Sequence, residues 1–264
     1  MPLDETQIQR YARHIVLHEV GGVGQSKLLD AKVLVVGAGG LGSPLLMYLA
    51  AAGIGTIGVV DDDTVSLSNL QRQVAHTTDR IGVAKTDSAQ QTVAALNPDV
   101  TLVRHPVRLV AANALDLIGG YDLVADGSDN FATRFLVNDA CYFASKPLVS
   151  AAILRFDAQI STFKAYLGSG QPCYRCIFRE PPPPGLIPSC AEGGVLGALA
   201  GTIGSFQAIE VVKEILAIGN SLSGWLVIFD ALSTTFRKVA VKRDANCPLC
   251  GTQPEIHDLS LHVA

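Results

Sequence analysis

Hydrophobic residues form short uninterrupted runs through the first half of the chain. Runs of this kind, bounded by turn residues, are typical of strands buried on both faces of a parallel sheet. The strands that they predict lie at 32–36, 56–60, 100–104, 122–125 and 147–150. Between them, apolar residues at helical spacing predict helices at 41–52, 81–96, 111–117 and 130–144. This alternation predicts an α/β fold: a Rossmann-like, mostly parallel sheet with helices on both faces.

The pattern differs at the two ends of the chain. Apolar residues from Ile8 to Ile15 recur on one helical face behind a capping Asp4, and predict an N-terminal helical arm (1–30) with a break at Gly21-Gly22. After residue 150, alternating runs predict antiparallel strands and a long helix that begins near Val195; the strands lie at 159–166, 225–230 and 235–241. The prolines at 181–184 cannot pair in a sheet and predict an exposed crossover loop over about 178–194. We therefore expect one domain over 1–264, with a Rossmann-like half at 31–150 and a β-rich half at 151–264.

Composition narrows the class of protein. The chain has 264 residues, of which 48% are hydrophobic and only 17% charged, which excludes disorder and allows a large core. The formal net charge of -4 argues against nucleic acid as a partner. Low charge together with a mean hydropathy of +0.32 indicates a surface partly covered by another subunit.

Two uncharged segments, 33–60 and 193–209, could each be mistaken for a membrane helix. Both are interrupted by several glycines, so we expect neither to span a bilayer. The first residues are acidic and lack the apolar core of a secretory signal, so we expect a cytoplasmic protein. Paired cysteines in that compartment are more often metal ligands or catalytic thiols than disulfides.

Glycines at 37, 39, 40 and 42 follow the first predicted strand and open a helix. Glycine lets the backbone approach phosphates closely there, and the helix N-terminus favours their negative charge. Asp61 ends the second strand, where a carboxylate can bind ribose hydroxyls. The loop predicts a nucleotide site and leaves ATP and a dinucleotide both open.

Polar residues farther along favour ATP over a dinucleotide. Asn69, Arg72 and Lys85 would disperse the charge of a reacting triphosphate, whereas hydride transfer would leave them without a role. Asp129 and Asn130 follow the fourth strand at the carboxyl edge of the sheet, and suit Mg²⁺ bound with substrate phosphates. The alternative is that Ser128 or Asp129 only caps the N-terminus of the helix predicted at 130–144.

Two C-x-x-C pairs lie in the second half, separated by 70 residues. Four thiolates complete a closed tetrahedral zinc site, which would be structural because it has no open position for a substrate. The alternative is that each C-x-x-C pair is a separate redox-active pair of thiols. The four residues are Cys173, Cys176, Cys247 and Cys250.

Cys190 stands apart from these pairs, between the proline run and the long helix. A thiol just ahead of a helix can have a lowered pKa and act as a nucleophile. The alternative is an inert buried cysteine, the role that we also expect for Cys141.

The combination of these motifs, from Arg10 to Cys250, resembles the MoeB/ThiF/HesA family of ubiquitin-activating-like adenylyltransferases, and within it the molybdopterin-synthase branch looks most similar. The resemblance implies ATP-dependent adenylation of the C-terminal glycine of a small ubiquitin-like sulfur-carrier protein of the MoaD or ThiS type, which ends in Gly-Gly. Pyrophosphate is released, and the acyl-adenylate serves later sulfur transfer in molybdopterin, thiamine or related biosynthesis. The half at 31–150 would bind ATP, and the half at 151–264 would bind the carrier.

The resemblance also implies roles for single residues. Gly40 would contact the phosphates, Asp61 the ribose, and Asn69, Arg72 and Lys85 the triphosphate. Asp129 would lie on the magnesium side as a ligand, without donating a proton. The nucleotide site would also include Ser68, Leu70, Gln71 and Asn130.

Two further residues would act beyond the nucleotide site. Arg13 would reach the phosphates of the other subunit of a homodimer, and Cys190 would take part in sulfur or acyl transfer in some relatives. The cofactors implied are ATP, Mg²⁺ and Zn²⁺, and the sulfur would come from a sulfurtransferase or a cysteine desulfurase. The alternatives at this point are adenylation of a peptide or a tRNA base, an NAD-dependent oxidoreductase, and an inactive partner subunit.

Overall fold

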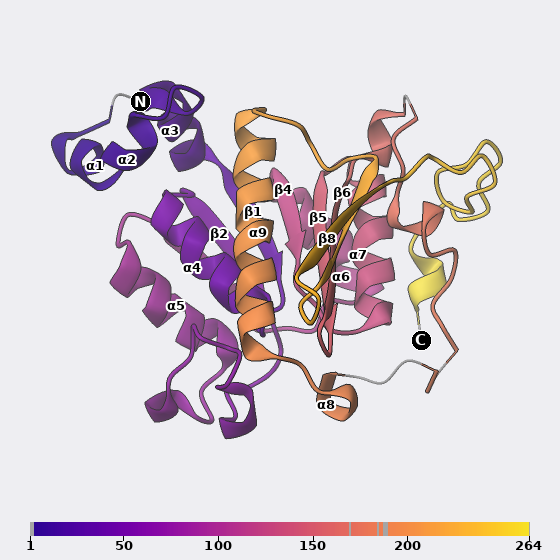
Figure 1. Cartoon of the computed structure of the whole chain (residues 1–264), viewed down its shortest axis with the longest axis horizontal. Coiled ribbons are helices and arrows are strands. Elements are labelled where there is room, and N and C mark those ends of the chain that lie inside the picture. Colours follow the sequence, from indigo (N-terminus) through magenta and orange to yellow (C-terminus); the bar gives the residue numbers. More distant parts are fainter. Residues whose placement is uncertain (1–2, 169, 184, 187–189, 264) are drawn as a thin grey trace.

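The computed structural model describes residues 3–168, 170–183, 185–186 and 190–263, without the side chains of residues 190 and 191. One sheet of eight strands runs through them in the order β3-β2-β1-β4-β5-β6-β7-β8 (Figure 1). The first five strands are parallel: β1 (Lys32–Val36), β2 (Thr56–Val60), β3 (Thr101–His105), β4 (Leu123–Asp126) and β5 (Leu148–Leu154). The remaining three are antiparallel: β6 (Asp157–Phe163), β7 (Trp225–Asp230) and β8 (Thr235–Ala240). The predicted fold class is confirmed.

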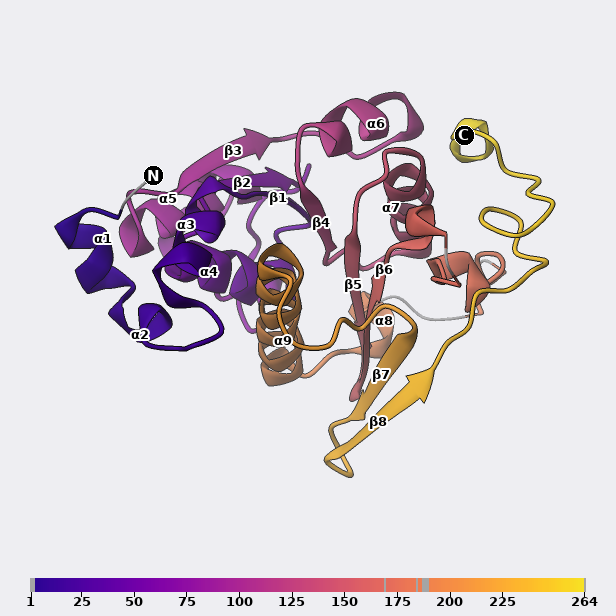
Figure 2. The same cartoon turned by 90° about the horizontal axis from the view of Figure 1, so that it is seen from above.

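Helices cover both faces of the parallel half (Figure 2). One face packs against α4 (Gly42–Ala52), α5 (Lys85–Leu96) and α9 (Gly197–Leu216), and the other against α6 (Ala111–Gly119) and α7 (Phe131–Phe143). Alternate residues of β1 enter the two hydrophobic cores: Val33 and Val35 one, Leu34 and Val36 the other. An uninterrupted apolar run is what such a doubly covered strand requires.

The N-terminal arm consists of α1 (Glu5–Arg10), α2 (Ala12–Ile15) and α3 (Gly21–Asp30). Asp4 caps α1 as predicted, and accepts a hydrogen bond of 2.8 Å from the backbone N–H of Gln7. The break predicted at Gly21-Gly22 is wrong, because α3 begins at Gly21. The positive φ of Gly21, 57°, lets the chain turn into the helix at that residue.

Three predicted boundaries differ from the structure by three residues or more. The strand expected to end at residue 166 ends at Phe163. The helix expected from residue 81 begins at Lys85, because Ala84 instead forms a β-bridge with Thr64. The strand expected to end at residue 150 continues to Leu154 and turns through Arg155 into β6. The apolar residues 151–154 extend it, and Arg155 takes the positive φ of 55° that the tight turn needs.

The second half carries several short helices: η3 (Ala165–Leu167), η4 (Tyr174–Cys176) and α8 (Cys190–Gly193). The second half also contains η5 (Ser260–His262), whereas η1 (Leu67–Asn69) and η2 (Thr78–Arg80) lie in the first half. No helix in the described part of the chain is long and apolar enough to cross a membrane. Pro184 and residues 187–189 of the predicted crossover loop lie outside the described residues.

Candidate functional site

A cleft of about 290 Å³ opens at the carboxyl edge of the parallel strands, where β1, β2 and β4 end. Ligands collect at this edge in open α/β sheets. Predicted site residues from several segments of the chain line the cleft, among them Gly40, Asp61, Arg72, Lys85, Asp129 and Asn130. These residues span 90 positions of the sequence, and the fold brings them around one space.

The glycine loop forms one wall of the cleft, between β1 and α4. Gly37 has a φ of 91°, a conformation that favours glycine. A Cβ atom on Gly42 would lie 1.8 Å from the carbonyl oxygen of Gly37, so no larger residue fits there without moving the loop. The loop therefore takes this shape only with glycine at both positions.

Asp61 holds the glycine loop from the end of β2. Its Oδ2 accepts a hydrogen bond of 2.8 Å from the Ala38 N–H, and its Oδ1 accepts one of 2.9 Å from the Asp63 N–H. The Nζ of Lys85 lies 2.7 Å from Asp63 Oδ2 and 3.9 Å from Asp61 Oδ1. Burial raises the pKa of Asp61, and the charge of Lys85 opposes that rise. Of the three acids at 61–63, Asp61 is thus the one fixed against the loop.

Arg72 enters the cleft from the turn that follows η1. Its guanidinium donates to Asn69 Oδ1 at 2.8 Å and to the Ser68 carbonyl at 3.3 Å. Its Cδ would lie 3.4 Å from a Cβ atom on Gly40, so the arginine stem lies along the glycine loop. Ser68, Asn69, Leu70 and Gln71 do not line the cleft in the described structure. Ser68 and Asn69 instead orient Arg72.

The junction of β4 and α7 forms the opposite wall. Asp126 is fully buried, and its carboxylate accepts hydrogen bonds from the Ser128 N–H at 3.0 Å and the Ser150 hydroxyl at 3.1 Å. Asp129 and Asn130 are exposed and face the cleft. The alternative in which Ser128 or Asp129 caps α7 is wrong, because Asn130 caps it by accepting the Thr133 N–H at 2.9 Å. The carboxylate of Asp129 is therefore available to a ligand.

The cleft also contains residues that the sequence reasoning missed. Arg134 is buried, and its Nη2 donates to the Ser128 carbonyl at 3.0 Å while its Nε has no partner. Gln73, with Oε1 buried and unpartnered, lies beside Gly39. Position alone could have indicated Arg134, one helical turn after Asn130. Arg108 also lines the cleft, from the loop after β3, and no motif marks it.

A second, largely apolar groove of about 390 Å³ adjoins the cleft. The two hollows share Asp129, Arg134 and Ile153. The groove continues along β5 and β6 to Ile228 of β7, and the segment containing Phe178 and Pro182 forms its far rim. It offers an extended chain a route to the cleft.

Two further predicted residues, Arg13 and Cys190, belong to other elements of the fold. Arg13 is exposed on α2, in the N-terminal arm, and does not line the cleft of its own chain. Cys190 begins α8, which lies against β5. Shortly after α8, Val195 pairs with Arg155 and lines the cleft. Pro188 and Ser189, just before Cys190, are outside the described residues.

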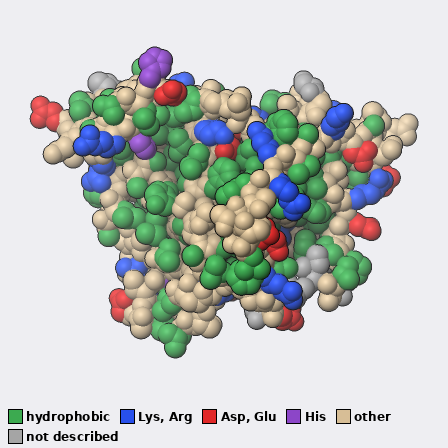
Figure 3. Space-filling view, in the orientation of Figure 1, with side chains coloured by type: hydrophobic (Ala, Val, Ile, Leu, Met, Phe, Trp, Pro, Cys, Tyr) green, Lys and Arg blue, Asp and Glu red, His purple; other side chains and the backbone are tan. Residues whose placement is uncertain are grey.

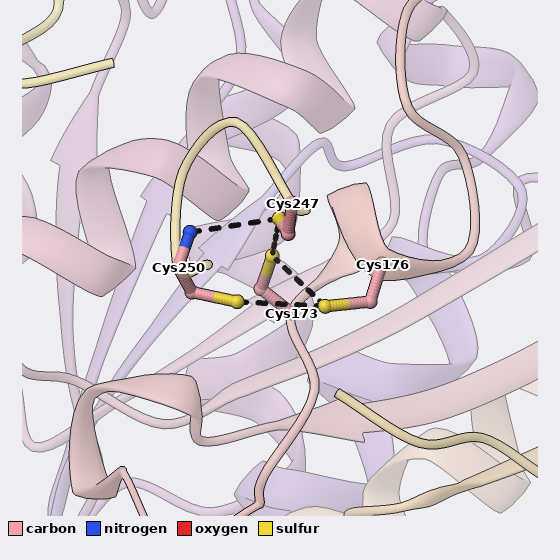
Figure 4. Close-up of side chains that lie close together, drawn as sticks. All are labelled: Cys173, Cys176, Cys247 and Cys250. Atoms are coloured by element: carbon pink, nitrogen blue, oxygen red, sulfur yellow. Dashed lines mark hydrogen bonds between the residues drawn. The ribbon is translucent and has the colours of Figure 1, made fainter. Parts of the chain in front are cut away.

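The four cysteines of the two C-x-x-C pairs converge on one point (Figure 4). Their Sγ atoms all lie within 4.8 Å of one another, including 3.5 Å between Cys173 and Cys247 and 3.4 Å between Cys176 and Cys250. Thiolates bound to one zinc at about 2.3 Å lie at comparable separations. The predicted clustering is confirmed, and the donor set fits a closed zinc site. Cys141 is fully buried in α7, as expected of a core residue.

Comparison with known proteins finds matches that extend over nearly the whole sequence. Residues 11–249 match the ThiF family. The chain is 50% identical over 255 residues to the sulfur carrier protein adenylyltransferase of Thermus thermophilus, covering 96% of this chain and 94% of that protein. It is 49% identical over 251 residues to the SAMP-activating enzyme E1 of Haloferax volcanii, covering 95% and 92%.

The fold is also shared with solved structures of lower sequence similarity. The crystal structure of Escherichia coli MccB with MccA-N7isoASN superposes with a TM-score of 0.80 at 22% identity, covering 94% of this chain and 76% of that one. PaaA superposes with a TM-score of 0.78 at 21% identity, covering 92% and 76%. Together these similarities extend over nearly the whole chain.

Proposed function

The chain belongs to the ThiF family, and on this basis we propose that it uses ATP to adenylate the C-terminal glycine of a small ubiquitin-like sulfur-carrier protein. The Thermus and Haloferax relatives, named for activating such carriers, support this at about half sequence identity. The observation that carries the proposal is the apolar groove that meets the polar cleft at Asp129. A narrow Gly-Gly tail lying in the groove would bring its carboxylate to the nucleotide.

The chemistry needs charge neutralisation more than proton transfer. An oxygen of the carrier carboxylate attacks the α-phosphorus, a new phosphorus–oxygen bond forms, and the bond to the bridging oxygen breaks to release pyrophosphate. The nucleophile is already ionised at neutral pH, so no side-chain base is required. Two anions must meet, and Arg72 and Lys85 supply positive charge beside the glycine loop.

Asp129 and Asn130 offer oxygen ligands of the kind that Mg²⁺ takes. The ion would neutralise charge on the triphosphate. The four clustered cysteines would hold Zn²⁺ in a structural role, since a fourth thiolate leaves no open position.

The proposal is tested by ATP–pyrophosphate exchange with candidate carriers that end in Gly-Gly. Exchange should require one carrier and disappear when its terminal glycine is deleted. Arg72→Ala and Asp129→Ala should each abolish exchange in a folded protein, and Arg104→Ala, at an exposed residue outside the cleft, is the matched control. Exchange with a peptide or a tRNA in place of every carrier would instead support another acceptor.

We further propose that the active unit is a homodimer in which Arg13 serves the partner's site. Hydrophobic side chains gather over α4 and α9 on the face in Figure 3, and Tyr48 of α4 and Ile209 of α9 are each 57% exposed. An exposed apolar surface of this kind is typical of a subunit interface. Arg13→Ala and Arg72→Ala subunits, each inactive alone, should regain about a quarter of wild-type activity when mixed at equal amounts, because half of the dimers are mixed and hold one intact site. No recovery after verified subunit exchange would exclude action between subunits.

The role of Cys190 is tested separately. We propose that Cys190→Ala retains adenylation, because Arg72 and Lys85 supply the positive charge that the adenylation step needs. A thiol-sensitive adduct with the carrier, seen by mass spectrometry in the wild type and absent in the variant, would make Cys190 an acceptor of the activated carrier. The sulfur would come from a sulfurtransferase or a cysteine desulfurase.

A further inference from the structure

His76 is a buried histidine directly behind the glycine loop. Its side chain does not line the cleft, and the residue is only 5% exposed. Nε2 lies 2.9 Å from the carbonyl oxygen of Ala38, and Nδ1 lies 2.9 Å from the hydroxyl of Ser88 in α5. The proposed chemistry gives this imidazole no role.

The two partners determine the protonation of the ring. A carbonyl oxygen can only accept a hydrogen bond, so Nε2 carries the proton and donates to Ala38. Burial lowers the pKa of His76, which keeps the ring neutral at neutral pH, and Nδ1 then accepts from the Ser88 hydroxyl. The ring is thus held between α5 and the glycine loop in one tautomer.

The hydrogen bond to Ala38 also constrains the next residue. The C=O of Ala38 and the N–H of Gly39 belong to one planar trans peptide, so they point in opposite directions. With the oxygen held by His76 inside the protein, the N–H of Gly39 is turned to the other side. Gly39 lines the cleft, and neither it nor Gly40 donates its N–H within the described structure.

The preceding peptide is held in a similar way. The N–H of Ala38 donates to Asp61 Oδ2, so Ala38 is fixed at its N–H by β2 and at its C=O by His76. The segment that carries His76 is in turn held to α5, because Arg80 Nη1 donates to the Ser88 carbonyl at 3.0 Å and to Thr92 Oγ1 at 2.7 Å. These contacts leave the loop little freedom to rotate its peptides.

We infer that His76 is a positioning residue: it fixes the Ala38–Gly39 peptide so that the Gly39 N–H faces the cleft, ready to donate to a phosphate oxygen of the nucleotide. Donors oriented before binding need no reorganisation when the anion arrives. The inference rests on the proposed function only in taking ATP as the ligand. His76 would thus influence the affinity for the nucleotide although it lies outside the cleft.

The test compares two amide side chains at this position. The amide of His76→Gln reaches about as far as Nε2 and can still donate to Ala38, whereas the amide of His76→Asn reaches only as far as Nδ1. The Kd for Mg-ATP, measured by titration calorimetry, should stay within about 3-fold of wild type for His76→Gln and rise about 10-fold for His76→Asn, as expected for one lost hydrogen bond. His76→Phe, which removes both nitrogens, should match His76→Asn.

Exchange kinetics separate positioning from a general weakening of the fold. The KM for ATP should rise in His76→Asn while the KM for the carrier stays unchanged. Equal Kd values for ATP in folded His76→Gln and His76→Asn would overturn the inference. If the wild-type protein binds ATP but shows no exchange with any carrier, the proposed carrier adenylation is contradicted and the role of His76 is not. If the wild-type protein binds no ATP, both proposals are overturned.

Discussion

Arg175 and Asp139 form a two-point ion pair inside the protein. Arg175 Nε donates to Asp139 Oδ1 at 2.8 Å and Nη2 donates to Oδ2 at 2.7 Å, with both side chains at most 3% exposed. Arg175 lies between Cys173 and Cys176, and Asp139 lies in α7, so the pair joins the first C-x-x-C turn to the main domain. His262 of η5 adds a contact of 2.7 Å to Asp139 Oδ2.

Breaking this pair should be costly, because removing one partner leaves the other charge buried. We expect Asp139→Ala to lower the free energy of unfolding by about 3–5 kcal/mol. The measurement is urea unfolding in buffer that contains zinc. The exposed pair Arg104–Asp87 is the control, and Asp87→Ala should cost less than about 1 kcal/mol. Similar losses at the two sites would show that burial does not set the energy of the Asp139 pair.

Metal analysis should find one zinc ion per chain, held by the four clustered thiols. Cys247→Ser should lose the metal and unfold at a lower temperature, because zinc binding contributes to folding free energy. Cys141→Ala, a change at a buried cysteine outside the cluster, should retain it. A metal-free wild type with an unchanged melting temperature after chelation would contradict a structural zinc site.

Gly42→Ala should disrupt the glycine loop, because the new Cβ would lie 1.8 Å from the Gly37 oxygen. We expect at least a 10-fold weaker Kd for ATP and a loss of about 1–3 kcal/mol in unfolding free energy. The control is Gly22→Ala in α3, where an added Cβ meets no atom within 4 Å. That change, in the first turn of α3, should alter the free energy of unfolding by less than about 0.5 kcal/mol. Tight ATP binding by Gly42→Ala would show that the loop can move.

Stability should fall as the pH is lowered through the histidine range. Burial lowers the pKa of His76 and of His105 from the ordinary value of 6.5, so the unfolded chain binds protons first. The two histidines do not lower the free energy of unfolding well above pH 6.5. Below that pH each lowers it by at most about 1.4 kcal/mol per pH unit. The unfolding free energy of His76→Gln should therefore change less between pH 7.5 and 5.5 than that of wild type. A wild-type slope in His76→Gln would contradict this explanation of the pH dependence.

Sequence predicted most of the sheet, because strands covered on both faces need uninterrupted apolar runs such as that of β1. It also indicated that Asp61 and Asp129 lie close together, since both follow strands whose ends gather at one edge of a parallel sheet. The contacts behind the cleft were not predictable. No local pattern sets the distance between His76 and Ala38, 38 positions apart, or the pairing of Arg175 with Asp139. Such contacts depend on how α5 and α7 pack, which only the folded chain determines.

The cysteine cluster closes the chain into a ring. It joins residues 173–176 to residues 247–250, and the segment between them contains α8, α9, β7 and β8. β7, which belongs to that segment, is also hydrogen-bonded to β6, which precedes the segment in the sequence. A protease that cut after Arg179 would therefore yield two pieces that stay together through the pairing of β6 with β7, and through the proposed zinc ion when it is bound. A cut at that point would open the rim of the groove without separating the two parts of the domain.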